Sequence, residues 1–132
     1  MSGQGSTSNY SGKFGENQVA AALLHSGVPF QSQSTKYADL GGLRRLDFLA
    51  VDRKGVEWAI EVKNHSGAPG TIWQKYAYTI LELGPIPARK ALVLTGARHP
   101  EARIEKIRSW CQFQHVLLFV DVNYLMEALC QE

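Results

Sequence analysis

Residues 46–63 have the sequence LDFLAVDRKGVEWAIEVK, and this stretch decides the fold that we expect. Two apolar runs, 46–51 and 56–63, flank the segment Asp52-Arg53-Lys54-Gly55, which has the composition of a turn. β-Branched and aromatic residues in both runs favour extended backbone. The sequence therefore predicts an antiparallel β-hairpin with a four-residue turn.

Acidic side chains mark one end of this hairpin. Because side chains alternate along a strand, Glu61 and Lys63 should share one face, while Ile60 and Val62 point to the other face and into a core. Asp47 lies early in the first strand and Glu61 late in the second. Antiparallel pairing should bring the two carboxylates together, and this end of the hairpin is the predicted active site.

These residue types suit a divalent cation. Mg²⁺ takes oxygen ligands and keeps several waters, so Asp47, Glu61 and the backbone carbonyl of Val62 would suffice as protein ligands, with Mn²⁺ as a substitute. Lys63 would orient or deprotonate a water, or stabilise charge that develops on phosphorus. The alternative is an amphipathic hairpin in which Glu61 and Lys63 only form a surface ion pair.

Glu16 lies on the apolar side of a predicted helix. The helix should run from Lys13 to Ser26, and its apolar stripe consists of Val19, Ala20, Leu23 and Leu24. Glu16 falls within that stripe, where a carboxylate is costly unless it is paired or bound to metal. The alternative is a partly solvated first-turn glutamate that the helix dipole favours.

A further helix follows the hairpin. Thr71-Ile72-Trp73-Gln74 has the form of a capping box, and Gly84-Pro85 should end the helix. Its predicted apolar stripe consists of Trp73, Tyr76, Ala77, Ile80 and Leu81. Gln74 and Tyr78 lie at the edge of this stripe, where they could contact a substrate strand, or instead serve as a capping residue and a rim aromatic.

The order of these parts resembles the PD-(D/E)XK nuclease superfamily over residues 13–95. Glu61-Val62-Lys63 stands where the (D/E)XK element belongs, and Asp47 stands where the first acid belongs, although Leu46 replaces the proline that often precedes it. Glu16 resembles the helical glutamate of small archaeal Holliday-junction resolvases. Residues 74–78 resemble the QxxxY element of recombination-helicase and exonuclease relatives.

The resemblance implies a fold, an activity and a set of site residues. The implied fold is α/β, with a restriction-endonuclease-like αβββαβ core and a mixed central sheet flanked by helices. The implied activity is Mg²⁺-dependent cleavage of DNA. The catalytic residues implied are Glu16, Asp47, Glu61, Lys63 and Gln74, with Asp47, Glu61 and Val62 holding the metal.

The rest of the chain fits one α/β domain. Residues 1–12 are rich in Gly, Ser and Asn and should form a flexible tail, which leaves residues 13–132 for the nuclease domain. After the second helix we expect a strand at 90–95, a helix at 101–112, a strand at 116–122 and a helix at 123–130. Right-handed crossovers would complete a sheet of about five strands.

Composition sets limits on function. The chain has 132 residues, a net charge of +2 and a pI near 8.6, which is too weakly basic to indicate nucleic-acid binding by itself. The residues predicted to contact nucleic acid are Arg44, Arg45, Lys75 and Tyr78. Cys111 and Cys130 show no metal-ligand or disulfide spacing, and no apolar run could span a bilayer, so a cytoplasmic protein is expected.

The sequence therefore predicts a metal-dependent endonuclease. Its small size suggests that it selects DNA by structure, at junctions or nicks, and that it works as a homodimer when two strands must be cut. Two alternatives remain: a non-catalytic nucleic-acid-binding subunit on a nuclease-like fold, and a sequence-specific endonuclease of the restriction or homing type.

Overall fold

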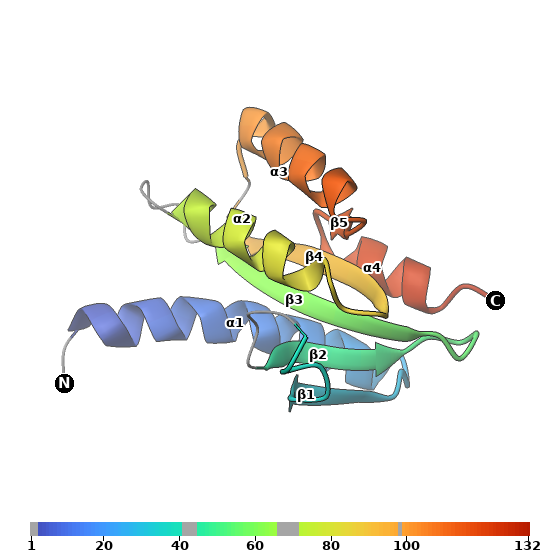
Figure 1. The fold of residues 1–132 in the computed structure, drawn as a ribbon. Helices are drawn as coiled ribbons and strands as arrows, with labels where there is room; N and C mark the ends of the chain where they lie inside the picture. Colours follow the sequence, from blue (N-terminus) through green and yellow to red (C-terminus); the bar gives the residue numbers. More distant parts are fainter. Residues whose placement is uncertain (1–2, 41–44, 66–71, 98) are drawn as a thin grey trace.

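A five-stranded mixed β-sheet forms the centre of the protein, and helices cover both of its faces (Figure 1). The computed structural model describes residues 3–40, 45–65, 72–97 and 99–132. In chain order the elements are α1 (Gly3–His25), β1 (Phe30–Ser34), β2 (Leu46–Val51), β3 (Glu57–His65), α2 (Ile72–Leu83), β4 (Arg89–Gly96), α3 (Glu101–Phe113), β5 (Leu117–Phe119) and α4 (Val122–Leu129). The predicted α/β class and the αβββαβ order of its first six elements are confirmed.

The sheet changes from antiparallel to parallel at its central strand. The strand order is β1-β2-β3-β4-β5, with antiparallel pairing among the first three strands and parallel pairing among the last three. The predicted hairpin is confirmed as β2 and β3, with Phe48 opposite Ile60 and Val51 opposite Glu57. The carboxylate of Asp52 stabilises the turn by accepting hydrogen bonds of 2.9 Å from the backbone N–H groups of Lys54 and Val56.

One face of the sheet packs against α1 and α4. Val19 and Leu23 of α1 and Leu125 and Leu129 of α4 are fully buried there. The strands contribute the alternating residues that the hairpin pattern predicted, including Phe48, Ile60 and Val62. On this face α1, the helix that carries Glu16, packs against the central strand β3.

The other face packs against α2 and α3. Each of these helices connects two parallel strands, β3 to β4 and β4 to β5, and both lie on the same side of the sheet (Figure 1). Their buried residues, Tyr76, Ile80, Leu83, Ile107 and Cys111, pack with Leu49, Ala59, Leu92 and Leu94 of the strands. The sheet is therefore covered on both sides, as in most proteins with parallel strands.

Two helix boundaries differ from the prediction. α1 begins at Gly3 and not at Lys13, so most of the segment predicted as a flexible tail is helical. No proline interrupts this segment, and extending an existing helix costs much less than nucleating one. α4 begins at Val122 because Asp121 caps it, accepting a 2.7 Å hydrogen bond from the Asn123 N–H, and this shortens the strand predicted at 116–122.

Two leucines predicted to face the core are exposed. Leu24 of α1 has an exposed fraction of 71%, and Leu81 of α2 has one of 59%. In each helix the preceding residue occupies the buried position instead: Leu23 in α1 and Ile80 in α2. The predicted capping residue Thr71 lies outside the described residues.

Both cysteines are free, Cys111 buried and Cys130 half-buried. In the part of the chain that the structure describes, no helix is long and apolar enough to cross a bilayer.

Candidate functional site

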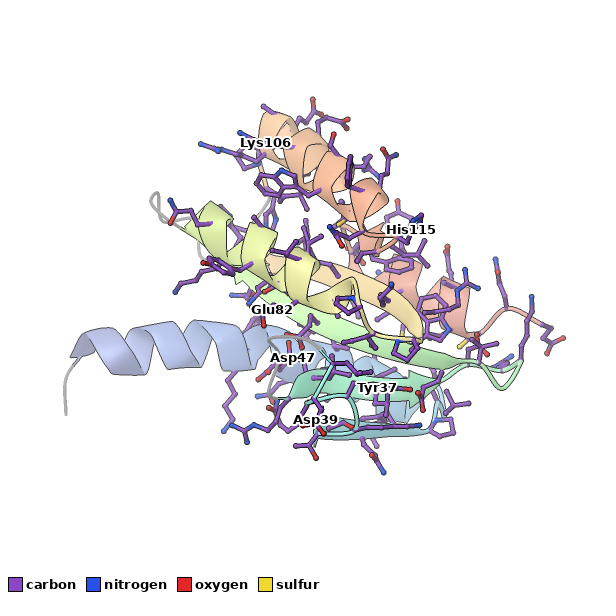
Figure 2. The ribbon with its side chains drawn as sticks, viewed as in Figure 1. Tyr37, Asp39, Asp47, Glu82, Lys106 and His115 are labelled. Atoms are coloured by element: carbon purple, nitrogen blue, oxygen red, sulfur yellow. The ribbon has the colours of Figure 1, made fainter. Side chains whose placement is uncertain are left out.

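The two predicted acids of the hairpin lie side by side. Continuing the β2–β3 register by one residue from Phe48 and Ile60 places Asp47 opposite Glu61. The Asp47 N–H donates a 2.6 Å hydrogen bond to Oε2 of Glu61, and the Val62 N–H donates a 2.8 Å hydrogen bond to Oδ2 of Asp47. The carboxylates thus accept hydrogen bonds from the backbone of the neighbouring strand. Figure 2 labels Asp47 where β2 meets α1.

Glu16 joins this pair from the first helix. Its carboxyl group shares a hydrogen bond with Asp47, and Nε2 of Gln33 donates a 3.2 Å hydrogen bond to its Oε1. Glu16, Asp47 and Glu61 therefore form one group, here called the acidic cluster, to which α1, β2 and β3 each contribute one residue. The prediction that Glu16 lies near the acids of the hairpin agrees with this geometry.

A glycine allows α1 to approach the sheet this closely. A Cβ atom at Gly15 would lie 2.5 Å from Oγ1 of Thr95 and 3.0 Å from Cβ of Asn64. Real Cβ atoms essentially never come within 3.0 Å of another heavy atom, so a larger residue here would displace the Thr95 side chain, the helix or the strands. Gly15 precedes Glu16 directly, and it thereby sets how far the Glu16 carboxyl group reaches into the cluster.

The acidic cluster holds protons more tightly than ordinary carboxyl groups do. The hydrogen bond to Asp47, burial and the charge of Asp47 raise the pKa of Glu16 from 4.5 to about 7. Burial and the charge of Glu61 raise the pKa of Asp47 to about 6. Burial also raises the pKa of Glu61 to about 6. The raised pKa values mean that the cluster is partly protonated near neutral pH.

Lys63 supplies the positive charge nearest to the cluster on β3. It follows Glu61 by two residues on the same strand, and its charge lowers the pKa values of both Glu16 and Glu61 against the effect of burial. Lys63 is half-buried. The predicted carboxylate-and-lysine arrangement on one face of β3 is present.

The burial of Glu61 differs from the surface position that the hairpin pattern suggested. Its exposed fraction is only 5%, and it lies on the face of the sheet where α2 packs against β3. A carboxylate in a simple surface ion pair would be solvated. The burial of Glu61 therefore argues against the alternative of an exposed amphipathic hairpin.

A metal ion bound at the acidic cluster would have few protein ligands. Among the described residues no group of three or more His, Cys, Asp and Glu side chains has the arrangement of a metal site. Mg²⁺ needs only one or two carboxylates beside waters and a substrate phosphate. The backbone hydrogen bonds engage Oδ2 of Asp47 and Oε2 of Glu61, and a cation would neutralise the negative charge that the two carboxyl groups carry when ionised.

The remaining predicted site residues contribute no side chain to the acidic cluster. Gln74, Lys75 and Tyr78 are exposed on α2, and within the described residues no hydrogen bond joins Gln74 to the acids. Arg45 is exposed directly before β2, and Arg44 lies outside the described residues. Val62 is buried, and its backbone takes part in the hydrogen bond to Asp47.

A buried pair of histidines beyond Lys63 was not predicted from the sequence. His65 is the last residue of β3, and its ring lies 4.7 Å from that of His99, whose Nε2 is 3.0 Å from the hydroxyl of Tyr76. Burial and the nearby His65 lower the pKa of His99 to about 4, while burial raises the pKa of Tyr76 to about 12. The signal in the sequence was the spacing of Glu61, Lys63 and His65, which occupy every second position and therefore share one side of β3.

Comparisons with known proteins show likeness of fold only. No protein-family model matches the chain, and no curated protein matches it. Solved structures with a similar arrangement include SfsA from Pyrococcus furiosus in complex with Ca²⁺. SfsA is 17% identical to this chain with a TM-score of 0.46, and the match covers 84% of this chain and 55% of the SfsA chain. Another is a protein of unknown function, AF1548, which is 15% identical with a TM-score of 0.48 and covers 78% of this chain and 54% of that one. The chain thus spans about half the length of each of these structures.

Proposed function

We propose that this protein is a metal-dependent endonuclease that hydrolyses phosphodiester bonds of DNA. The observation that carries the proposal is the acidic cluster, in which Glu16, Asp47 and Glu61 converge from three elements beside Lys63. Like charges placed together in a half-buried site are costly, and a cation that binds there offsets the cost. We also propose that the chain belongs to the PD-(D/E)XK nucleases, because its element order and the positions of these residues resemble theirs.

Asp47, Glu61 and the Val62 carbonyl would hold Mg²⁺, with Mn²⁺ as a substitute. When bound, the metal supplies a Lewis acid for the phosphate and lowers the pKa of a water. The protein's own contribution is to fix the two carboxylates by the hydrogen bonds between Asp47, Glu61 and Val62. This arrangement holds the ligands in place before substrate arrives.

Glu16 and Lys63 would act on the attacking water. A carboxyl group with a pKa of about 7 can take up and release a proton at neutral pH, so Glu16 suits the role of a general base, and Gln33 would position it through Oε1. The Lys63 ammonium would orient the water or stabilise negative charge on the phosphate. Glu16 and Lys63 would thus both act next to the carboxylates of Asp47 and Glu61.

DNA would reach the cluster along exposed polar residues. Arg45 lies two residues before Asp47 and is exposed, which suits a phosphate contact. Gln74, Lys75 and Tyr78 on α2 are available to a substrate strand or to a protein partner. Selection of junctions or nicks, and action as a homodimer, remain part of the proposal because the chain is small.

A cleavage panel tests the activity. Purified protein is incubated with duplex, nicked, flapped, four-way-junction and single-stranded DNA, with Mg²⁺ or Mn²⁺ and with EDTA. We expect metal-dependent cleavage that Lys63→Met reduces by roughly 10²-fold or more, with DNA affinity retained. Lys54→Met, which removes an exposed lysine from the hairpin turn, is the matched control and should cut like the parent. Equal rates for the two variants would remove Lys63 from the mechanism.

One observation favours a second candidate, a non-catalytic nucleic-acid-binding protein. Asp47 and Glu61 both accept backbone hydrogen bonds, which is also how acids serve a purely structural role. Calorimetry with Mn²⁺ distinguishes the two functions. A nuclease site should bind Mn²⁺ and lose it in Glu61→Gln, whereas a structural pair should bind no metal and lose only stability.

A further inference from the structure

A cavity of about 370 Å³ lies at the carboxyl end of β4, and the proposed catalytic steps do not use it. Its walls come from the end of β4, from α1, from α3 and from the segment that leads into α4. Small-ligand sites measure about 300–1,000 Å³, and in α/β sheets they lie at this end of the parallel strands. The lining includes Gln18, Leu94, Thr95, His99, Ile104 and Asp121.

The cavity lies close to the acidic cluster. Leu94 pairs with Lys63 in the sheet, and neighbouring strands are about 4.8 Å apart, so the cavity begins one strand away from Lys63. Thr95 is a residue against which Gly15 packs, one position before Glu16. A DNA strand with a phosphate at the acidic cluster would therefore have its neighbouring nucleotides within reach of the cavity.

The charges of the lining do not suit a phosphate group. Among the described residues that line the cavity none is a lysine or an arginine, and Asp121 is an acid. Burial and the nearby His65 lower the pKa of His99 to about 4, so its ring is neutral at neutral pH. The Asn123 N–H at the start of α4 already donates to Asp121. The cavity thus suits an uncharged group.

Two oxygen acceptors in the lining favour a ligand with N–H donors. The buried Thr95 hydroxyl donates a 2.9 Å hydrogen bond to Oδ1 of Asn64, so its oxygen can only accept a further hydrogen bond. A carboxylate such as that of Asp121 likewise only accepts. Leu94 and Ile104 add apolar walls. A flat ring that is apolar on its faces and carries an amino group at its edge matches this combination.

His99 gives the cavity a fixed aromatic wall. Its ring lies 4.7 Å from that of His65 and 5.8 Å from that of Tyr76, and its Nε2 is 3.0 Å from the Tyr76 hydroxyl. These contacts hold the His99 ring in place, so little side-chain entropy is lost when a ligand packs against it. Aromatic side chains of this kind are common partners of unstacked bases.

We propose that this cavity binds one unpaired nucleobase with an exocyclic amino group, from a nucleotide next to the phosphate that is cleaved. The proposal rests on the proposed nuclease function and specifies its substrate. A base must leave the duplex stack before it can enter such a cavity, so the site favours DNA with unpaired bases, as at flaps and junctions. Thymine has no amino group and should bind less well than adenine or cytosine.

Nucleosides test the cavity without any cleavage. The ¹⁵N-labelled full chain is titrated in EDTA with deoxyadenosine, deoxycytidine or thymidine up to about 10 mM, and the amide shifts are followed by NMR. We expect saturable shifts at Thr95, Ala97 and Val122, with millimolar dissociation constants and binding of thymidine weaker by about fivefold or more. Unshifted amides at these positions, or equal affinity for the three nucleosides, would overturn the proposal.

Two variants connect this binding to the cavity. Ala97→Trp fills the cavity and should abolish the shifts, whereas Ala102→Trp, at an exposed position of α3 outside the lining, should leave them unchanged. Asp121→Asn keeps an acceptor for the Asn123 N–H, so α4 stays capped. This variant should bind deoxyadenosine and thymidine with affinities within about twofold of each other. Shifts that persist in Ala97→Trp, or a preference that persists in Asp121→Asn, would contradict the proposal.

Oligonucleotides distinguish a base of DNA from a free nucleoside. Fluorescence anisotropy in EDTA measures the affinity for a single strand of deoxyadenosine nucleotides and for a blunt duplex. Ala97→Trp should weaken binding of the single strand about tenfold or more and leave binding of the duplex unchanged. Nucleoside binding without this effect would make the ligand a free nucleoside and refute the assignment to DNA. Base binding by a protein that cuts no DNA would count against the nuclease proposal alone.

Discussion

Buried acids in this protein titrate in opposite directions, depending on what surrounds them. Asp52 is buried, yet hydrogen bonds from Trp58, Val56 and Lys54 outweigh its burial and lower its pKa. Asp47 and Glu61 also accept backbone hydrogen bonds, but each lies beside another carboxyl group, and their pKa values are raised. Hydrogen-bond donors and the charge of Arg89 thus stabilise Asp52 as an anion, whereas in the acidic cluster burial outweighs the hydrogen bonds that Asp47 and Glu61 accept.

Glu16→Gln tests this difference at a single residue. The amide keeps the size and hydrogen-bonding capacity of the side chain but removes a charge from the cluster. Without metal at neutral pH we expect an equal or higher melting temperature, and in Mg²⁺ a smaller stabilising shift than in the parent. Cleavage should fall by roughly 10²-fold or more.

The control for this variant is Glu127→Gln, at an exposed glutamate of α4. It should match the parent in melting temperature, metal shift and cleavage. If Glu16→Gln behaves in the same way, Glu16 is only a surface charge near the start of the packed part of α1.

At the scale of residues, the features that follow from the alternation of side chains along a strand could be predicted from the sequence. Asp47 and Glu61 could be paired because the turn between their strands is short and its residues are typical of turns. Gln33 could not be found in this way. It has a left-handed backbone conformation, with φ of 53°, and its contact with Glu16 crosses from β1 to α1.

At the scale of elements, the packing of α1 on the sheet depends on Gly15. Gly15→Ala places a methyl group against Thr95 and Asn64, so we expect α1 to shift and the protein to lose about 1 to 3 kcal/mol of stability. Cleavage should fall as well, because Glu16 moves with the helix. Chemical denaturation and the cleavage assay measure the two effects.

Asn17→Ala, at an exposed position of the same helix, is the control for Gly15→Ala. Both substitutions introduce alanine, which favours helix, so their intrinsic effects on α1 should be stabilising. A Gly15→Ala protein as stable as Asn17→Ala would mean that α1 and the strands can separate slightly without cost.

Most helices and strands were predictable, and their ends and exposed sides were less so. Apolar alternation in the hairpin and the continuous apolar run at 91–94 fixed β2, β3 and β4 to within a few residues. Periodicity alone could not decide between adjacent leucines in α1 or between Ile80 and Leu81 in α2, because both positions fall near the edge of an apolar stripe. Tertiary packing makes that choice, and a single sequence does not contain it.

At the scale of the whole molecule, the acidic cluster links stability to pH. The ordinary pKa values of Glu16, Asp47 and Glu61 are 4.5, 3.8 and 4.5, and folding raises them to about 7, 6 and 6. Between these values the folded protein binds more protons than the unfolded chain. The contribution of the cluster to stability is therefore fully present below about pH 4 and is lost as the pH rises through about 7.

Melting temperatures of metal-free protein between about pH 5 and about pH 8 check this sign. Other groups also titrate, so the informative quantity is the difference between the parent and Glu16→Gln. We expect the parent to lose more stability than the variant over this range, and Mg²⁺ at the upper end to reduce the difference. A parent that gains stability relative to the variant as the pH rises would contradict the raised pKa of Glu16.

The hairpin that carries Asp47 and Glu61 also has a consequence for how the chain folds. These acids are separated by only 14 positions, whereas the parallel pairing of β3, β4 and β5 must wait for two helical crossovers. We expect the hairpin to form before the transition state, so repulsion between the two acids should slow refolding at neutral pH. Stopped-flow measurements should then show that Mg²⁺ speeds refolding and changes the unfolding rate little. If Mg²⁺ acts on the unfolding rate alone, the acids meet only after the barrier has been crossed.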